Sequence, residues 1–505
     1  MHERLAAPAC QAFPQAVPIH MSRDVLAAYL NASAQPPPLL NRMTTTAAGK
    51  LYLGGPRLPL CPPRVQPLPG AGCTRQDLSD LLFYSFGVSR LHLSTPNATR
   101  TTLELRRPVG SGGALYPTQL YVSHQGVPGV PDGLSHFDPL HHQLAVLLYG
   151  DPLTGPDRPA HHSVHPPRIT VLLTSASWNT MPKYQHFGYR LITLEFGMVA
   201  EQLGIVGHAL GARCSLTLEW PDAFSRWIQP TGDERPGPVV TLEWPDTERP
   251  KVTHNAPVRT GAVSRSPAVP GLTTCPLAWQ VEIAAANLPA APHSSSSPET
   301  LTPCPGGASS VFRQLRARRS SGEGFRNVPV SGTALRNAIS EVSEWIDGHD
   351  TTLLMVARAV TGIRPGIYRF DLLNPAPVPA SCPDPAVLLL GGTPGATAQS
   401  NQPAAWLYLT AKLDLHSDES AARYRDTQIR IGRLLQRLHL ACTAQGIDGH
   451  VSLAYDVHLT QHLFSLNGEW YPAAQLVLGT ARPETEHFSM DFRATAPAWP
   501  TAPGR

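Results

Sequence analysis

Residues 189–211, YRLITLEFGMVAEQLGIVGHALG, recur later in the chain as residues 424–446, YRDTQIRIGRLLQRLHLACTAQG. The two stretches align over 23 residues without a gap and share six identities, including the opening Tyr-Arg pair and the closing glycine. Their apolar residues have helical spacing, and a glycine after the last turn commonly ends a helix. The sequence therefore predicts two equivalent long helices.

The segments before each helix also match. Gly133 to Asp138 and Gly366 to Asp371 share the form G-x-x-x-F-D, and the apolar strand 169–174 (ITVLLT) has a counterpart at 406–410 (WLYLT). Three matched elements in one order and at similar spacing are hard to obtain by chance. We predict two copies of one α+β domain in tandem, which form a pseudo-dimer within the chain.

A glycine stands at the ninth place of both helices, as Gly197 and Gly432. A glycine inside a helix costs about 1 kcal/mol relative to alanine. Its presence in both copies predicts that the two helices approach each other closely at the centre of the pseudo-dimer.

The composition indicates long connections around few domains. The 505 residues include 53 prolines, about double the usual share, and only 15% charged residues against about 25% in an average protein. We expect a Pro-rich N-terminal arm (1–70), a first domain (71–250), a Pro/Ser-rich linker with at most one short ordered piece (251–308), a second domain (309–490) and a tail (491–505). Whether the arm is a peptide-docking element or disordered stays open. A further helix is predicted at residues 75–86, with Thr74 as its N-cap.

Charge and cysteine patterns exclude several classes of protein. The formal net charge of +3 gives no case for binding nucleic acid or an anionic membrane. The eight cysteines contain no C-x-x-C pair, and no H-E-x-x-H is present, so no metal site is expected. The chain begins without a signal-peptide pattern and has no apolar run near 18 residues. We expect a cytoplasmic protein.

Three clusters of residues have side chains or backbone suited to ligand binding or catalysis. A glycine-rich turn lets backbone N–H groups approach a planar or anionic ligand; it comprises Ser111, Gly112 and Gly113. A pair of arginines beside a pair of serines suits a phosphate; it comprises Arg318, Arg319, Ser320 and Ser321. Lys183 and Tyr184 are a general acid–base pair if burial lowers their pKa values. Alone, each cluster could equally be an ordinary turn, a basic surface or a helix entrance.

Together and in this order, the clusters resemble the nitroreductase-like FMN oxidoreductases. Within that group the chain is similar to the SagB-type (McbC-like) dehydrogenases, which oxidise azolines in ribosomally made peptides. The resemblance spans roughly residues 75–247 and 309–483. It is carried by SGGALYP at 111–117, KY at 183–184, YR at 189–190, EFG at 195–197, and RRSS at 318–321 with Phe325.

The resemblance implies FMN at the interface between two copies. The RRSS motif would bind the flavin phosphate, with Arg482 as a further ligand, and the SGGALYP loop would approach the flavin ring. The first copy lacks RRS before the helix at Arg75, and the stretch VARAVTGIRP before Gly366 lacks S-G-G and L-Y-P. One composite site and one FMN per chain are therefore expected. Gly110 replaces the usual proline, and Glu323 is expected to point away from the phosphate.

The resemblance also implies a mechanism. A base removes the ring Cα proton of the azoline, while hydride leaves the neighbouring carbon for the flavin. Lys183 is the expected base, with Tyr184 as its hydrogen-bond partner or proton relay; the second copy has Asp418-Glu419 at that place. Glu195, whose counterpart is Arg430, is expected in an inter-copy salt bridge or in solvent. The repeated Tyr-Arg pairs are expected to be structural.

The implied partners are an azoline-containing precursor peptide and a separate cyclodehydratase, because the chain shows no motif for the ATP site of such an enzyme. Further association of pseudo-dimers stays open. Two other functions stay open as well. One is a general NAD(P)H-dependent nitro or quinone reductase with the same fold, although Lys183-Tyr184 argues against it. The other is a flavin-free scaffold subunit of a peptide-modifying complex.

Overall fold

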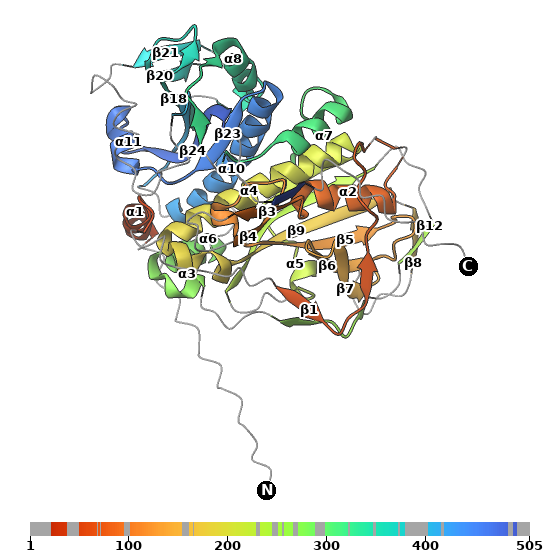
Figure 1. The fold of residues 1–505 in the computed structure, drawn as a ribbon. Coiled ribbons are helices and arrows are strands. Elements are labelled where there is room, and N and C mark those ends of the chain that lie inside the picture. The colour runs from red at the N-terminus through yellow and green to blue at the C-terminus, as the bar shows by residue number, and fades with distance from the viewer. Residues whose placement is uncertain are drawn as a thin grey trace.

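The computed structural model shows two antiparallel sheets flanking a central pair of long helices (Figure 1). It describes residues 22–37, 50–67, 69–70, 72–94, 102–153, 161–164, 166–228, 233–244, 251–254, 257–265, 271–287, 298–321, 324–346, 350–371, 374–378, 402–415, 419–482 and 488–491. Most of the arm before residue 50, the end of the tail, and the predicted positions Glu323 and Asp418 lie outside the described residues.

The sheet of the first copy has nine strands, and its central strands are buried because both faces are covered. The order is β13 (Val258–Arg259), β7 (Gln143–Tyr149), β6 (Gly133–Asp138), β5 (Thr118–Gln125), β9 (Arg168–Ala176), β11 (Glu234–Glu243), β10 (Arg213–Thr217) and β15 (Glu299–Thr300), with β2 (Arg57–Pro59) beside β7.

The sheet of the second copy has the same neighbour order. It runs β16 (Phe325–Arg326), β24 (Trp470–Ala481), β22 (Ala405–Lys412), β18 (Thr351–Ala357), β20 (Gly366–Asp371) and β21 (Asn374–Val378), with β23 (Asp448–Ser452) also on β24. Thus β5, β6, β9, β11 and β10 correspond to β18, β20, β22, β24 and β23. The matched sequence segments fall in β6 and β20 and in β9 and β22, which confirms the tandem α+β prediction.

The central helices α4 (His186–Ala209) and α10 (Ser420–Ala444) touch at the two predicted glycines. A Cβ atom added to Gly197 would lie 2.0 Å from the carbonyl oxygen of Ile429, and one added to Gly432 would lie 2.1 Å from that of Leu194. The glycine Cα atoms therefore pack directly against the facing helix, and the predicted close approach is confirmed.

The repeated Tyr-Arg pairs are structural, as predicted, and their arginines join the copies. Arg190 is buried, and its guanidinium donates to the carbonyl oxygen of Ser33 at 2.8 Å and to the hydroxyl of Tyr455 at 3.3 Å. Arg425 reaches the opposite way and donates to the carbonyl oxygen of Pro236. Each copy thus places an arginine on the backbone or a side chain of the other.

A buried cluster of ion pairs also links the two central helices. The carboxylate of Glu201 on α4 accepts from Arg433 at 3.1 Å and from Arg437 at 2.5 Å, both on α10. Both guanidinium groups also lie over the indole of Trp345. Because such charges are costly to leave unpaired once buried, the cluster favours one alignment of the two copies.

Segments outside the two sheets also cross between the copies. Helix α1 (Ser22–Ala32) packs its Tyr29 ring against Tyr189 and Tyr424, so this part of the N-terminal arm belongs to the core. Near the C-terminus, β25 (Phe488–Asp491) returns to pair with β3 (Arg90–Ser94) of the first copy, and β3 pairs with β4 (Thr102–Arg106).

The stretch 251–308 contains more regular structure than the single piece expected. Helix α6 (Pro276–Asn287) packs on α1 and α10, and its buried Glu282 accepts a 2.7 Å hydrogen bond from the hydroxyl of Tyr189. Short strands in this stretch form pairs: β12 (Lys251–His254) with β8 (His161–Val164), and β14 (Val263–Arg265) with β1 (Leu51–Leu53).

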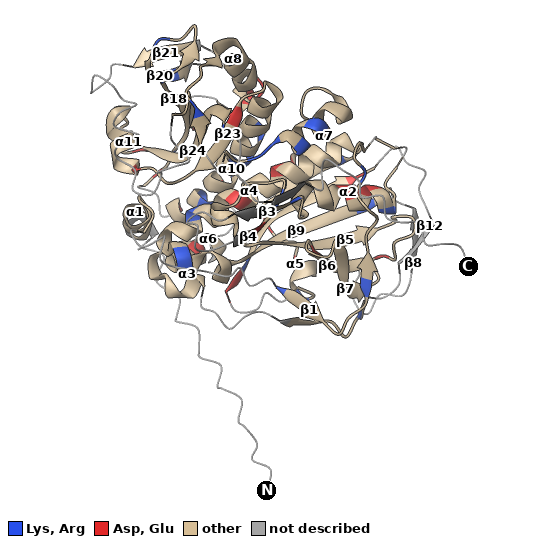
Figure 2. Cartoon of the chain, in the orientation of Figure 1, with Lys and Arg blue, Asp and Glu red and all other residues tan. Residues whose placement is uncertain are grey.

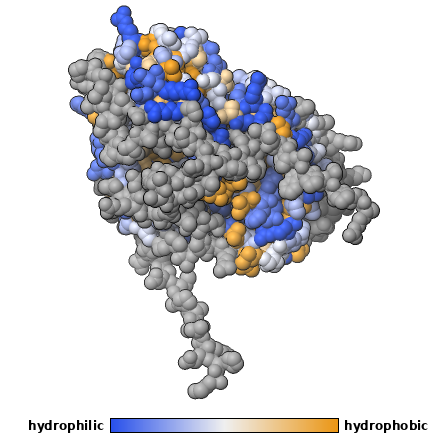
Figure 3. Space-filling view, in the orientation of Figure 1, coloured by the Kyte–Doolittle hydropathy of each residue, from blue (hydrophilic) through white to orange (hydrophobic). Residues whose placement is uncertain are grey.

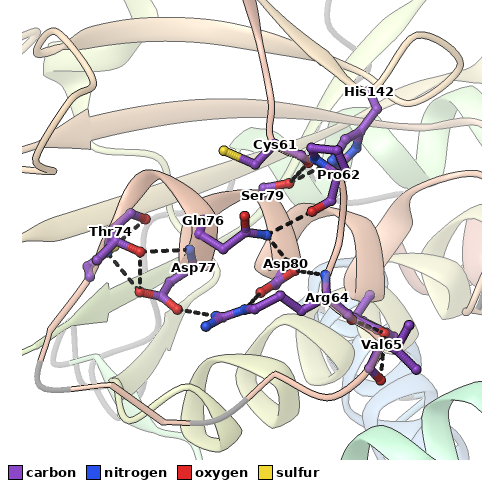
Figure 4. Close-up of polar contacts among 12 residues, drawn as sticks. Cys61, Pro62, Arg64, Val65, Thr74, Gln76, Asp77, Ser79, Asp80 and His142 are labelled. Atoms are coloured by element: carbon purple, nitrogen blue, oxygen red, sulfur yellow. Dashed lines mark hydrogen bonds and ion pairs between the residues drawn. The ribbon is translucent and has the colours of Figure 1, made fainter. Parts of the chain in front are cut away.

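The predicted helix at residues 75–86 is present as α2 (Arg75–Phe86), and Thr74 caps it as expected. The carboxylates of Asp77 and Asp80 both accept hydrogen bonds from the Arg64 guanidinium, whose Nε lies 2.5 Å from Asp80 Oδ2 (Figure 4). The hydroxyl of Tyr84 donates to the carbonyl oxygen of Arg64 at 2.6 Å. These contacts fasten the preceding loop to α2.

Charged and apolar residues are mixed over the described part of the molecule (Figure 2). Basic and acidic segments are interspersed along the ribbon (Figure 2). The visible face mixes hydrophilic and hydrophobic atoms (Figure 3), and the exposed apolar side chains include Leu51 and Leu53 on β1 and Val263 on β14. Among the described residues, no helix has the length and apolar character required to cross a bilayer.

Candidate functional site

The glycine-rich turn between β4 and β5 has a strained backbone. Gly113, Ala114 and Tyr116 all have positive φ angles, of 62°, 53° and 46°. Such angles cost energy for residues with a side chain, and they gather at functional sites. The turn is held by the backbone N–H of Tyr116, which donates to Ser111 Oγ at 2.9 Å, and by that of Arg107, which donates to the Tyr116 hydroxyl at 3.0 Å.

Lys183 and Tyr184 lie against this turn. They end the short helix α3 (Met181–Tyr184), which follows β9 and precedes α4. A Cβ atom added to Gly113 would lie 2.6 Å from Tyr184 Oη and 3.1 Å from Lys183 Nζ. A Cβ on Gly112 would meet the side chain of Leu191 at 2.8 Å. The structure therefore brings two of the predicted clusters together, and the missing side chains of the glycines make the room.

Burial shifts the pKa values of the pair in opposite directions. It lowers the pKa of Lys183 below its ordinary value, although the charge of Glu104 opposes this, and it raises the pKa of Tyr184 to about 12. The expectation that burial lowers both pKa values therefore holds only for the lysine. Lys183 Nζ lies 5.2 Å from the centroid of the Tyr184 ring, over its face rather than hydrogen-bonded to its hydroxyl. A lysine made easier to deprotonate suits a base, and a protonated tyrosine suits a donor.

Glu195 is buried and forms no inter-copy salt bridge with any residue that the structure describes, contrary to both expectations. It is buried on α4, where its Oε1 accepts from the hydroxyl of Thr118 at 2.8 Å and from the Thr118 backbone N–H at 3.3 Å. Burial raises the pKa of Glu195, and hydrogen bonds from Ser111 and Thr118 oppose that rise. Glu195 thus ties the end of the strained turn to the central helix.

The second copy reaches the same turn through Arg318. This residue follows α7 (Gly307–Ala317) and is buried, and its Nη2 donates to the carbonyl oxygen of Arg107 at 3.3 Å. Arg107 begins the segment that contains Ser111–Gly113. The start of the RRSS motif and the start of the glycine loop therefore touch, although 211 residues separate them.

The rest of the RRSS motif runs beside β23. Ser320 forms a backbone bridge with Gly449, and Ser321 donates from its N–H at 3.2 Å and its hydroxyl at 3.4 Å to the Gly449 carbonyl oxygen. The hydroxyl proton of Ser321 is thus already engaged, which favours Ser320 as the hydroxyl donor to a ligand. Arg319 is half-buried.

Arg482 lies next to this motif. It follows β24, and its Nε donates to the carbonyl oxygen of Phe325 at 2.9 Å, while its backbone N–H donates to Gly324 at 3.0 Å. The sheet edge thus brings Arg482 beside the segment that continues from Ser321. The guanidinium groups of Arg318 and Arg482, the Ser320 hydroxyl and the open glycine turn form a donor set that fits a phosphorylated planar cofactor such as FMN.

The reciprocal position in the second copy is a cavity of about 1250 Å³. Its walls come from the start of α10, the end of β22 and the loop before β18, with Leu216 and Leu218 of the first copy. Strand pairing shows that the counterpart of the glycine loop is EVSEWIDGHD at 341–350, because β18 matches β5. The comparison with VARAVTGIRP was therefore wrong by one strand, and the true counterpart also lacks S-G-G.

The helix wall of this cavity has different chemistry. Gly188, Leu191 and Glu195 of α4 align with Arg423, Asp426 and Arg430 of α10, and all three charged residues line the cavity. Charged side chains thus occupy the positions where the first copy has Gly188, beside Tyr184, and Leu191, beside Gly112. This wall does not offer the open, apolar surface that a flavin ring requires.

No family model and no curated protein matches the chain. Among solved structures, a protein from Anabaena variabilis that is provisionally assigned as a nitroreductase is 17% identical with a TM-score of 0.65, and the match covers 91% of this chain and 99% of that one. At this identity the likeness establishes the fold, and it runs along nearly the whole chain. The two copies therefore form a nitroreductase-like fold.

Two further likenesses concern parts of the chain. The E. coli microcin synthetase complex McbBCD with truncated pro-MccB17 bound is 16% identical and has a TM-score of 0.25, and the match covers 45% of this chain and 95% of that one. A provisionally assigned nitroreductase from Exiguobacterium sibiricum in complex with FMN is 13% identical and has a TM-score of 0.26, with coverage of 35% and 91%. TM-scores at this level carry no argument about this chain.

Proposed function

We propose that this chain is an FMN-dependent dehydrogenase that oxidises azolines to azoles in a ribosomally made, modified peptide. Two contacts carry the proposal: Gly113 lies against the pair Lys183-Tyr184, and Arg318 from the second copy contacts Arg107 at the start of the same glycine loop. The nitroreductase-like fold agrees with a flavin enzyme. The order of the motifs, which resembles SagB-type dehydrogenases, narrows the proposed substrate to an azoline.

In this proposal one FMN is held per chain, between the copies at residues 71–250 and 309–490. Arg318, Arg319, Ser320 and Arg482 would bind its phosphate, while Ser321 would hold the motif against Gly449. Ser111, Gly112 and Gly113 would approach the flavin ring. Bound FMN supplies the two-electron acceptor that no side chain can provide. The reciprocal cavity, with Arg423, Asp426 and Arg430 on its helix wall, is proposed to hold no flavin.

The protein's own part is proton transfer and orientation. Neutral Lys183 accepts the proton from the ring Cα, and burial beside Gly113 favours that neutral form. Tyr184 keeps its proton at neutral pH and orients the substrate by donating a hydrogen bond. The left-handed turn at 113–116, fixed to α4 through Glu195, holds the site in place.

The substrate would be an azoline-containing precursor peptide. A separate cyclodehydratase would form the azoline rings, since this chain carries no motif for that step. Two hydrogens leave the substrate as a proton and a hydride, and an added NAD(P)H would not be consumed.

A direct test uses the purified protein, FMN and synthetic peptides that carry one thiazoline or one oxazoline. We expect peptide mass to fall by two hydrogen atoms and, without oxygen, flavin absorbance to bleach in proportion. If the protein oxidises NAD(P)H with a nitroarene but leaves the peptide mass unchanged, it is a general reductase instead. If the purified protein is colourless and does not bind FMN, it is a scaffold subunit.

A further inference from the structure

Arg107 has an unusual environment at the base of the glycine loop. Its guanidinium lies between two rings, with the central carbon 4.2 Å from the centroid of Phe86 and 4.5 Å from that of Tyr116. Among the described residues, its Nε and Nη1 are buried without a hydrogen-bond partner. Buried guanidinium donors are normally paired, so these two orphaned donors indicate a missing acceptor.

The charge of Arg107 also lacks a close counter-ion in the described part of the chain. Glu195 and Asp138 act on it only through space, and their oxygen atoms accept hydrogen bonds from Thr118 and from His141. Burial lowers the pKa of Arg107 to about 10, which leaves the group protonated at neutral pH. The Arg107 side chain is thus half-buried, and within the described part of the chain its buried Nε and Nη1 have aromatic stacking as their neighbouring contact but no acceptor.

Arg107 is next to the cation that comes from the other copy. Arg318 donates to the Arg107 carbonyl oxygen at 3.3 Å. Burial raises the pKa of Tyr116, and the positive charges of both Arg107 and Arg318 oppose that rise. Like charges in one partly buried region repel each other, and an anion bound between the two arginines would stabilise both.

We propose that Arg107 is a phosphate ligand contributed by the first copy, so that the phosphate monoester of FMN is held from both sides of the pseudo-dimer. The inference rests on the proposed flavin function and adds a residue that the RRSS resemblance does not include. It also gives a physical reason why RRSS lies in one copy and the glycine loop in the other. The phosphate bound by RRSS would need the arginine that precedes the glycine loop as a second ligand.

The test compares Arg107→Met with Arg106→Met. Arg106 is the adjacent residue and pairs with Glu104 at 3.1 Å near the surface, so its loss controls for removing one positive charge from the same strand end. Binding of FMN and of riboflavin, which lacks the phosphate, is measured by flavin fluorescence. We expect Arg107→Met to weaken FMN binding by about 10- to 100-fold and to leave riboflavin binding unchanged. Arg106→Met should match the wild type for both ligands.

Thermal unfolding of the flavin-free proteins separates this role from a structural one. A phosphate ligand leaves an unpaired buried cation when no flavin is bound, so Arg107→Met should unfold at the same or a higher temperature than the wild type. A lower unfolding temperature, equal weakening of FMN and riboflavin, or unchanged FMN affinity would each overturn the inference. If wild type and Arg106→Met both fail to bind FMN, the proposed function itself fails.

Discussion

The Lys183→Met protein is expected to bind FMN as the wild type does and to oxidise an azoline peptide about 10²- to 10⁴-fold more slowly. Methionine preserves the bulk beside Gly113 but cannot accept a proton. Because only the neutral amine is a base, the wild-type rate of flavin reduction should rise with pH through the pKa of Lys183, which burial places below its ordinary value. That rise should be absent from the variant.

Lys412→Met is a matched control for this experiment. Lys412 is exposed, pairs with Glu469 at 3.5 Å and lines the reciprocal cavity, so its loss should leave both the rate and its pH dependence unchanged. Single-turnover reduction of bound flavin by the peptide is the measurement, since it isolates the chemical step. Full activity of Lys183→Met, or an unchanged pH profile, would remove the lysine from the mechanism.

Gly432→Ala is expected to lower the free energy of unfolding by about 3 kcal/mol or more. Helix propensity alone would stabilise the variant by about 1 kcal/mol. The new Cβ, however, would lie 2.1 Å from the carbonyl oxygen of Leu194, and backbone cannot move aside as a side chain can. The helices must separate, which weakens the Glu201 ion cluster and the flavin site between the copies. Denaturant unfolding followed by circular dichroism, with flavin content in parallel, checks both effects.

Gly204→Ala on α4 is the matched control. A Cβ there would meet the end of the Leu301 side chain at 2.6 Å, which a rotamer change can relieve, so we expect a change within about 1 kcal/mol. Combining Gly197→Ala with Gly432→Ala should cost less than the sum of the two, because both open the same contact. An additive pair, or a Gly432→Ala protein as stable as the control, would show that the crossing tolerates separation.

The duplication and the central glycines could be predicted because they leave a mark along the sequence. A glycine at the same place in both copies of a helix indicates a shared physical cause. Close packing of the two helices is such a cause, because glycine has no side chain to keep them apart. The meeting of the SGG turn with Lys183 was predictable only through the resemblance. Nothing in the spacing of those segments indicates that Gly113 and Lys183 touch.

Long-range polar partners could not be predicted. Glu195 finds Thr118, 77 residues earlier in the chain, and a glutamate in a helix pattern gives no sign that it is buried beneath a loop. Likewise, Arg107 reads as an ordinary basic residue before a glycine turn. Its two aromatic neighbours, Phe86 and Tyr116, come from a helix and from the far end of the loop.

Local motif matching also misplaced two features. The G-x-x-x-F-D match pairs β6 with β20 correctly, but the counterpart of the glycine loop lies before β18, whereas the expected stretch VARAVTGIRP follows that strand's start and leads into β20. Proline and serine content marked 251–308 as a linker. Composition does not reveal that Glu282 on α6 accepts a hydrogen bond from Tyr189, 93 residues earlier in the chain.

The most direct test of the composite site is the ratio of FMN to protein chain. The purified protein is saturated with FMN, freed of excess, and denatured, and the released flavin is measured against the protein concentration. The account predicts one FMN per chain, because Arg318 of the second copy contacts Arg107, at the start of the glycine loop, on one side of the pseudo-dimer, while Arg423, Asp426 and Arg430 line the reciprocal cavity. Two FMN per chain, or none, would contradict it.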